Sequence, residues 1–204
     1  MGVKDSKTEQ LIKDTAKRLF LTEGRMLATT QDIADAAGVN RTLLHYYFRS
    51  RDVLFDLVFK EALRELRERI QSVMLSTAPF REKIENLINV FFEELIKSPY
   101  LETFIVLQMN QDPGKYEELF RTLPGGEQKM KIFFKEIQAE MDKGTIPEMK
   151  PIHFFMNFFS LMAYPFVARP IYEKMFDLND AAFKKLVRER KKVILLSLFK
   201  NHEV

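Results

Sequence analysis

Residues 30–48 read T-Q-D-I-A-D-A-A-G-V-N-R-T-L-L-H-Y-Y-F and contain two short amphipathic segments on either side of a glycine. In the first segment, Ile33 and Ala37 are spaced as on one face of a helix. Gly38 supplies a backbone conformation that other residues adopt only at a cost, and Asn40 is a favoured residue for starting the second segment as a helix. The stretch predicts a helix-turn-helix, whose second helix would present its first residues to the major groove of DNA.

The second segment combines residues that suit base edges with residues that suit phosphates. Arg41 and Thr42 lie in its first turn, where an Arg can pair with guanine and a Thr methyl group can contact thymine. Imidazole and phenol groups one turn later suit phosphate oxygens. A plainer alternative treats the whole stretch as core and solvated face, with Leu44 and Phe48 in the core. We expect these residues to contact DNA: Thr30, Gln31, Asn40, Arg41, Thr42, His45, Tyr46, Tyr47 and Arg51.

The charge of the chain is distributed unevenly. Residues 1–51 carry nine Lys or Arg and six Asp or Glu, whereas residues 52–204 carry twenty-three of each, so the net charge of +3 lies wholly in the first quarter. Between Ala36 and Arg51 there is no acid at all. A positive excess in this place is compatible with nucleic-acid binding and also with a simple contribution to solubility.

The apolar spacing stays helical almost to the end of the chain. It predicts an all-α fold of about nine helices, in which an N-terminal helix-turn-helix unit (residues 1–50) joins a larger C-terminal helical bundle (residues 51–204). The expected helices cover residues 8–23, 31–37, 41–48, 51–74, 84–95 and 100–109, a pattern from 116 to 144 interrupted at Gly125-Gly126, a Phe-rich segment from 152 that Pro165 stops, and a last helix from 180.

Several classes of function find no support in the sequence. The chain has no cysteine, which excludes disulfides and thiolate metal sites, and its three histidines are far apart. We find no Glu-x-x-His pair and no glycine-rich phosphate loop, so we expect no enzyme, no metal and no cofactor. The apolar run 151–168 contains His153, Asn157 and Pro165, which favours a core helix over a membrane span. We therefore expect a cytoplasmic protein without a membrane partner.

Residues 29–55, T-T-Q-D-I-A-D-A-A-G-V-N-R-T-L-L-H-Y-Y-F-R-S-R-D-V-L-F, resemble the DNA-binding segment of the TetR family of bacterial transcriptional regulators. The resemblance is specific over about residues 8–58 and much weaker beyond. Thr42 departs from the family pattern, which often has Gly there, and Arg51 replaces the usual Lys. The matching positions are Ile33-Ala34, Ala37-Gly38-Val39, Tyr46, Phe48, Ser50 and Leu54-Phe55.

The resemblance implies a repressor that binds a palindromic operator in double-stranded DNA as a homodimer and is released by a small apolar ligand. The bundle would then bind the ligand and form the dimer through its last two helices. An alternative is an all-α module that binds a hydrophobic ligand or a partner helix without regulated DNA binding. The expected pocket residues are Phe91, Phe104, Gln108, Asn110, Phe155, Asn157, Phe159, Met162 and Tyr164. The expected dimer contacts are Phe158, Phe166, Phe183, Val187, Ile194 and Leu198.

Overall fold

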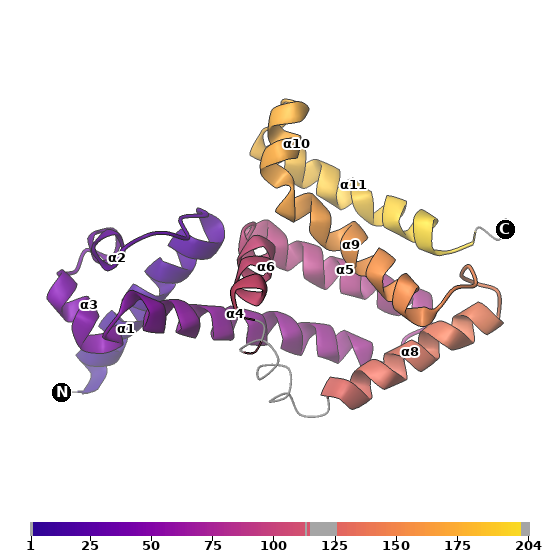
Figure 1. Cartoon of the computed structure of the whole chain (residues 1–204), viewed down its shortest axis with the longest axis horizontal. Coiled ribbons are helices and arrows are strands. Elements are labelled where there is room, and N and C mark those ends of the chain that lie inside the picture. Colours follow the sequence, from indigo (N-terminus) through magenta and orange to yellow (C-terminus); the bar gives the residue numbers. More distant parts are fainter. Residues whose placement is uncertain (1, 113, 115–125, 201–204) are drawn as a thin grey trace.

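A computed structural model describes residues 2–112, 114 and 126–200 of the chain (Figure 1). Within these residues the protein forms ten α-helices and one π-helix and contains no β-strand, which confirms the all-α expectation. The helical pattern expected at 116–120 and the start of the Gly125-Gly126 interruption lie outside the described residues. In chain order the elements are α1 (Gly2–Lys17), η1 (Arg18–Thr22), α2 (Thr30–Ala37), α3 (Arg41–Phe48), α4 (Arg51–Met74), α5 (Phe80–Lys97), α6 (Leu101–Gln111), α8 (Gly126–Asp142), α9 (Pro151–Val167), α10 (Arg169–Met175) and α11 (Asp180–Leu198).

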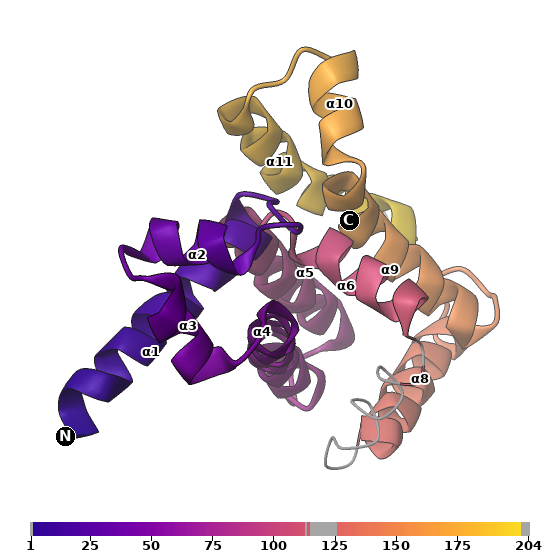
Figure 2. The same cartoon turned by 60° about the vertical axis from the view of Figure 1, so that its left-hand side comes forward.

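The first four elements form a small unit at one end of the molecule, which we call the headpiece (Figure 1). Helix α4 begins beside α3 and runs from the headpiece into the other helices, which we call the bundle. In Figure 2, α6 lies between the headpiece side of the molecule and α9, and it contacts both η1 and α9. Because α4 and α6 each contact both parts, a change in the bundle can reach the headpiece along two helices.

Four helices start at an Asn, Ser or Thr that caps the first turn. The side chains of Thr29, Asn40, Ser50 and Asn179 each accept a hydrogen bond from the backbone N–H three residues later. Such a cap satisfies one of the donors that a helix leaves unpaired at its start. These caps are why the beginnings of α2, α3, α4 and α11 could be located from the sequence.

The bundle has an interior rich in phenylalanine. Phe80 of α5 contacts Phe133 of α8 and Phe154 of α9, with ring centroids 6.1 and 5.9 Å apart. Phe166 of α9 lies edge-on to Phe183 of α11, at 5.9 Å. Large rings from four helices therefore meet in one continuous core, in the tilted and edge-on arrangements that aromatic pairs favour.

Pro165 does not end α9, contrary to the sequence expectation. A proline inside a helix leaves the carbonyl four residues earlier without its donor, which here is the carbonyl of Leu161. The Nε–H of Arg190 on α11 donates to this carbonyl at 2.9 Å, so the missing bond is replaced from a neighbouring helix. Helix α9 accordingly continues to Val167, and the short helix α10, which the sequence pattern missed, follows at once.

No single helix among the described residues is long and apolar enough to cross a membrane. By length and composition alone, α9 and α10 taken together pass such a test as a pair bent by 63°.

Candidate nucleic-acid interface

Helices α2 and α3 meet through small and apolar side chains. Ala34 and Leu44 are fully buried, and Phe48 is 3% exposed. Gly38 ends α2 with φ = 67°, a left-handed conformation that suits glycine, and the Val39 N–H bonds back to the Ala34 carbonyl at 3.0 Å. The two helices are thus held in the helix-turn-helix arrangement that the sequence predicts.

The opposite face of α3 carries polar and aromatic groups. Arg41, Thr42 and Tyr46 are exposed, and Tyr46 is the most open of them at 71%. Tyr47 is half-buried against the core and meets the Tyr46 ring edge-on at 5.1 Å. Arg41 and Thr42 occupy the first turn, so α3 presents them at the end that recognition helices insert into a major groove.

His45 is bound within α3 at both ring nitrogens. Its Nδ1–H donates to the carbonyl of Arg49 at 2.9 Å, and its Nε2 accepts the Nε–H of Arg41 at 3.2 Å. This pairing assigns one neutral tautomer, since Nε2 needs a lone pair to accept. In this arrangement the His45 ring orients the Arg41 side chain, and the expected direct phosphate contact by His45 stays a prediction.

Helix α2 is capped by Thr29. Thr29 and Asp32 form a reciprocal capping box that lowers the pKa of the Asp32 carboxyl through hydrogen bonds from Thr29. Thr30 is only 8% exposed, and its expected contact with phosphate stays a prediction. Gln31 is exposed and donates to Asp35 at 2.7 Å, and Asn40 is exposed while its Oδ1 caps α3 at 2.7 Å from the Leu43 nitrogen.

Arg51 joins separate segments of the headpiece, and 29% of its side chain remains exposed. Its Nε–H donates to the Ala28 carbonyl at 2.9 Å, and its Nη2 donates to the Met26 carbonyl. The guanidinium also lies over the rings of Phe20 and Phe55, at 5.6 and 5.0 Å from their centroids. These donors join the start of α4 to the loop before α2, and the expected phosphate contact at Arg51, through its backbone N–H and its side chain, stays a prediction.

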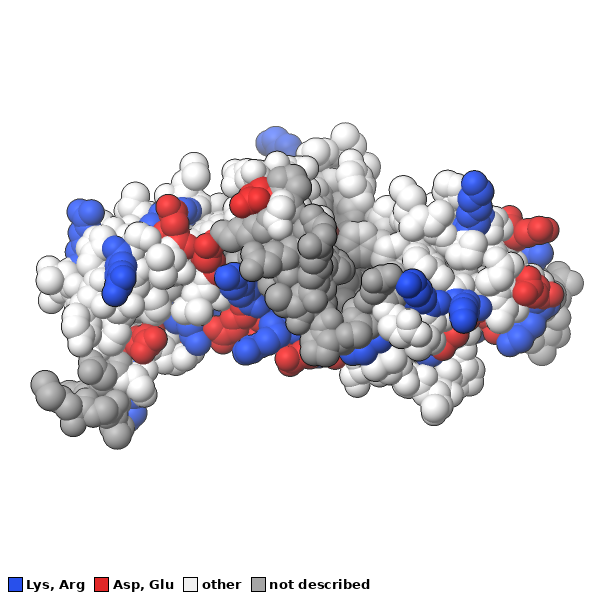
Figure 3. Space-filling view, turned by 60° about the horizontal axis from the view of Figure 1, so that its bottom comes forward, with Lys and Arg blue, Asp and Glu red and all other residues white. Residues whose placement is uncertain are grey.

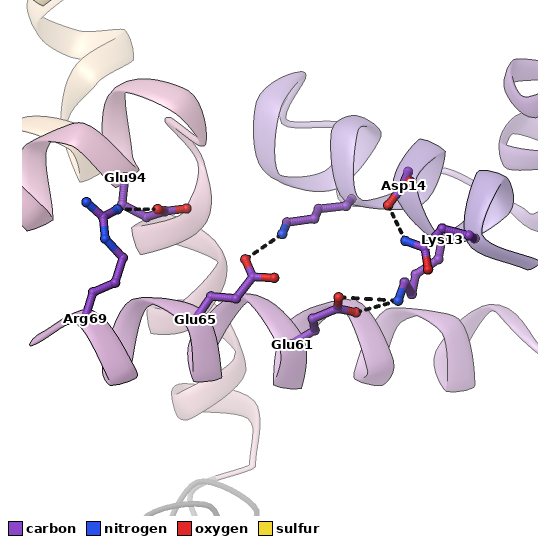
Figure 4. A network of polar contacts seen from close by, with 8 residues as sticks. Lys13, Asp14, Glu61, Glu65, Arg69 and Glu94 are labelled. Atoms are coloured by element: carbon purple, nitrogen blue, oxygen red, sulfur yellow. Dashed lines mark hydrogen bonds and ion pairs between the residues drawn. The ribbon is translucent and has the colours of Figure 1, made fainter. Parts of the chain in front are cut away.

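Ion pairs fasten the headpiece to α4 along one side (Figure 4). Lys13 and Lys17, one turn apart on α1, pair with Glu61 and Glu65, one turn apart on α4, at 3.0 and 2.8 Å. Each partly exposed pair contributes little stability, of the order of 0.2–1 kcal/mol. Because the two pairs share one spacing, they instead fix how α1 lies along α4.

The face of the molecule in Figure 3 carries cationic side chains at its headpiece end, with acidic side chains beside them, and a mixture of both charges farther along. The exposed cations of α3 and of the residue that follows it are Arg41 and Arg49. The residues around them, from 36 to 51, contain no acid. This part of the headpiece is the most favourable place for a polyanion, whose phosphates attract Lys and Arg.

The nine expected pocket residues differ in burial, and three of them, Phe91, Phe155 and Phe159, form a chain of ring contacts. Phe91 and Phe104 are buried, at 2% and 0% exposure, and Met162 is buried as well. Asn110, Asn157 and Tyr164 are exposed. Gln108 is half-buried and bonds to Gln111, whereas Phe155 and Phe159 stack on each other at 6.3 Å. The sequence pattern could not separate core from lining because both are rich in Phe and Met.

An open hollow of about 250 Å³ lies elsewhere, at the far end of the bundle. It is lined by residues of the α4–α5 loop, of α5 and of the end of α8, and none of the expected pocket residues is among them. In it, buried Lys83 pairs with Glu136 at 2.8 Å and Lys143 pairs with Glu140 at 2.7 Å. Its charges are therefore already balanced by its own side chains.

The six expected dimer contacts all lie on the wrong face of their helices. Each of them is at most 4% exposed and packs in the core of its own chain, so none can meet a partner. The apolar residues of α11 that do face outward are Leu186, Val193 and Leu196, which are about half exposed. The last helix is apolar on two sides, and the pattern alone did not show which side its own chain covers.

Glu102 is a candidate functional residue that sequence reasoning missed. It lies in the first turn of α6 and is 3% exposed, and burial raises the pKa of its carboxyl to about 7. The available signal was an acid at the start of the apolar run L-E-T-F-I-V-L, residues 101–107. Among the residues that the structure describes, no group of His, Cys, Asp and Glu could hold a metal ion.

The fold and this site define a helix-turn-helix protein with an attached helical bundle, and comparison with known proteins agrees. Residues 12–58 match the family model described as bacterial regulatory proteins of the tetR family. The regulator BetI of Rhizobium meliloti is 32% identical over 92 residues, and the repressor KstR2 of Rhodococcus jostii is 30% identical over 94 residues. The chain spans less than half the length of these curated relatives, 45% in each case, and the matches cover 45% and 46% of this chain.

Solved structures share the fold over nearly the whole chain. The ketosteroid transcriptional regulator KstR2 of Mycobacterium tuberculosis superposes with a TM-score of 0.68 at 15% identity, covering 98% of this chain and 97% of that one. The fatty acid degradation regulator FadR from Bacillus halodurans has a TM-score of 0.61 at 20% identity, with 92% and 94% covered. Residues 12–58 therefore match the TetR family of bacterial regulatory proteins, and the chain as a whole shares its fold with these solved transcriptional regulators.

Proposed function

We propose that this protein is a transcriptional repressor that binds a specific DNA operator through α3. The observation that carries the proposal is the geometry of α3, in which buried Leu44 and Phe48 hold the helix while Arg41, Thr42 and Tyr46 point outward. Arg41 and Thr42 then contact base edges, and Tyr46 contacts phosphate. The protein would act in the cytoplasm, where it meets the bacterial chromosome.

The active form in this proposal is a homodimer on a palindromic site. Two copies of α3 bind successive major grooves about one helical turn of DNA apart, roughly 34–36 Å. The dimer contact is formed by the outward apolar face of α11, with Leu186, Val193 and Leu196 against the same residues of a second copy. In this division residues 1–50 bind DNA and residues 51–204 form the ligand-binding and dimerisation part, with α4 shared between them.

Release from DNA is assigned to a small ligand with an apolar body, bound in the bundle. A ligand can shift the protein between two states only as far as its affinity for the two states differs. Helices α4 and α6 carry such a shift, since each of them contacts both the headpiece and the bundle. A change in their positions would alter the separation of the two α3 helices in the dimer.

The test is a gel-shift titration with duplex DNA from upstream of the chain's own gene, repeated at several salt concentrations. A specific repressor retards this duplex in excess competitor DNA. Its affinity falls steeply with salt, with a logarithmic slope of about −0.9 per neutralised phosphate. Binding that is equal on unrelated duplexes, or that is indifferent to salt, would reject the proposal. An Arg41→Ala, Thr42→Ala double variant provides the matched control for the role of α3.

A further inference from the structure

Glu102 is a buried acid without a partner. Its side chain forms no hydrogen bond or ion pair with any residue that the structure describes, although it is 3% exposed. An ionised carboxylate that is removed from water without compensation is costly, and the group responds by keeping its proton. A residue of this kind needs either a proton or a positively charged group brought in from outside.

The position of Glu102 on α6 indicates which side of the helix it faces. Phe104 faces the headpiece side, because its ring lies 6.4 Å from Phe20, 4.4 Å from Phe55 and 5.3 Å from Phe59. At about 100° per residue, Glu102 lies roughly 160° around the helix from Phe104. It therefore lies on the side of α6 that is turned away from these rings.

The residues that share the face of Glu102 are apolar and adaptable. Ile105, three positions along α6, is 7% exposed, and Met109, seven positions along, is half-buried against the core. Methionine side chains are flexible and adjust to ligands of different shape. The surroundings of Glu102 on α6 thus suit an apolar body, while the carboxylate itself suits a cation.

The same turn of α6 is joined to the headpiece. The Tyr100 N–H donates to the Leu21 carbonyl at 3.0 Å. The Tyr100 ring also lies so close to Gly24 that a Cβ there would come within 2.7 Å of it, which only a glycine allows. A displacement of α6 at Glu102, two residues from Tyr100, consequently reaches the loop that leads to α2.

We propose that Glu102 binds the ammonium group of an apolar amine on the side of α6 that is turned away from Phe104, and that amines are the ligand class to which this protein responds. The inference rests on the ligand-regulated function proposed above. The ammonium supplies both the charge and the donors that Glu102 lacks, so hydrogen bonds to a charged group are gained and a buried charge is compensated. Carboxylate ligands are disfavoured at the same place, and Arg169 does not attract them because it already pairs with Glu173 and Asp180.

The test compares three probes that share one phenyl body: phenethylamine, phenethyl alcohol and phenylacetate. The midpoint of thermal unfolding is measured with each probe for the natural protein, for Glu102→Gln and for Glu82→Gln. Glu82 is the matched control, since it is also an acid in the first turn of its helix but is exposed. We expect the amine to bind the natural protein about tenfold more tightly than the alcohol. This preference should be lost in Glu102→Gln and kept in Glu82→Gln.

Calorimetry gives a second readout that a purely structural role of Glu102 would not produce. Since the pKa of Glu102 is about 7, about half of the molecules hold a proton there at pH 7. An incoming ammonium ionises the carboxyl, so binding of phenethylamine should release about half a proton in the natural protein and none in Glu102→Gln. The released proton is measured from the difference in heat between two buffers of different ionisation enthalpy.

Two results overturn the inference. One is a natural protein that shows no preference for the amine over the alcohol and phenylacetate, and the other is a Glu102→Gln variant that keeps the preference. The failure of the repressor proposal would look different. In that case the amine preference and the proton release would persist, while a duplex carrying the operator would be neither bound nor released when phenethylamine is added.

Discussion

At the scale of single residues, the proposed DNA-binding face of α3 separates expected base recognition from positioning. Arg41 points outward from the first turn. Its Nε–H donates a hydrogen bond to Nε2 of His45, which lies one turn later. His45 is in turn anchored to the carbonyl of Arg49, whose φ of 54° is unusual for a residue with a side chain. Thr42 adds a methyl group and a hydroxyl where relatives of this kind often have glycine, so the sequence preference of this protein should depend on both Arg41 and Thr42.

Arg41→Ala should relax the sequence preference of DNA binding, at a cost of about 1–3 kcal/mol on the best operator and little on random duplex. Tyr46→Phe removes only a phenol hydroxyl and should weaken all sequences alike. The measurement is a set of binding isotherms on the operator and on duplexes with single base changes. Equal losses on every duplex for both variants would contradict this division of roles.

Glu102 makes the stability of the fold depend on pH. Burial raises the pKa of its carboxyl from the ordinary 4.5 to about 7, so the folded state binds the proton more tightly than the unfolded state. The stability that this group contributes is therefore complete below pH 4.5 and is lost as the pH rises through 7, by up to about 1.4 kcal/mol per pH unit. Glu102→Gln should remove this decline and be the more stable protein at pH 8. Urea unfolding at pH 5 and pH 8 measures this fall in the free energy of unfolding. If the fall is unchanged in Glu102→Gln, other groups cause it.

At the scale of elements, individual side chains supply bonds that the backbone lacks at helix junctions. Arg190 donates to the carbonyl that Pro165 leaves unpaired, and α9 continues as a result. Arg51 donates to the carbonyls of Met26 and Ala28, and the loop before α2 is held on the start of α4. Both contacts join segments far apart in sequence, so spacing within one segment could not reveal them.

Arg51→Lys should destabilise the headpiece by about 2–3 kcal/mol, because an ammonium cannot reproduce the forked pair of hydrogen bonds. Arg49→Lys is the matched control, since the Arg49 side chain is exposed. Amide hydrogen exchange in α2 and α3 reports the local loss, and urea unfolding reports the total. If Arg51→Lys is as stable as the natural protein but binds DNA more weakly, Arg51 acts through a phosphate contact and not through the stability of the headpiece.

At the scale of the whole molecule, the outward face of α11 determines the proposed assembly. Its inward face is covered by the chain's own core, with Phe183, Val187 and Ile194 at 1% exposure or less. Leu186, Val193 and Leu196 remain about half exposed in a row along the helix. An apolar face that recurs over three turns of a helix is an adequate centre for a contact between two copies.

Val193→Glu should convert the proposed dimer to a monomer, because two carboxylates would be buried against each other at the twofold axis. Leu75→Glu is the control, as Leu75 is also 50% exposed but belongs to the end of α4 and not to α11. Sedimentation velocity gives the mass of each protein. A Val193→Glu protein that sediments like the Leu75→Glu protein would place the dimer contact elsewhere.

The sequence by itself determined the local structure of this protein. Helix starts were predictable because the capping residues Thr29, Asn40 and Ser50 act on backbone groups within three residues. The helix-turn-helix was predictable because Gly38 and the spacing of Leu44 and Phe48 encode the turn and its buried side over short distances.

Only the tertiary structure decided which chemically suitable residues are free to act. Arg51 suited a phosphate but is engaged by two carbonyls more than twenty positions earlier, and Ile194 suited a dimer contact but is buried in its own core. Glu102 looked like one acid among many until its burial left it unpaired. The physical reason is that hydrogen-bond partners, burial and charge compensation depend on neighbours in space, which helical periodicity does not record.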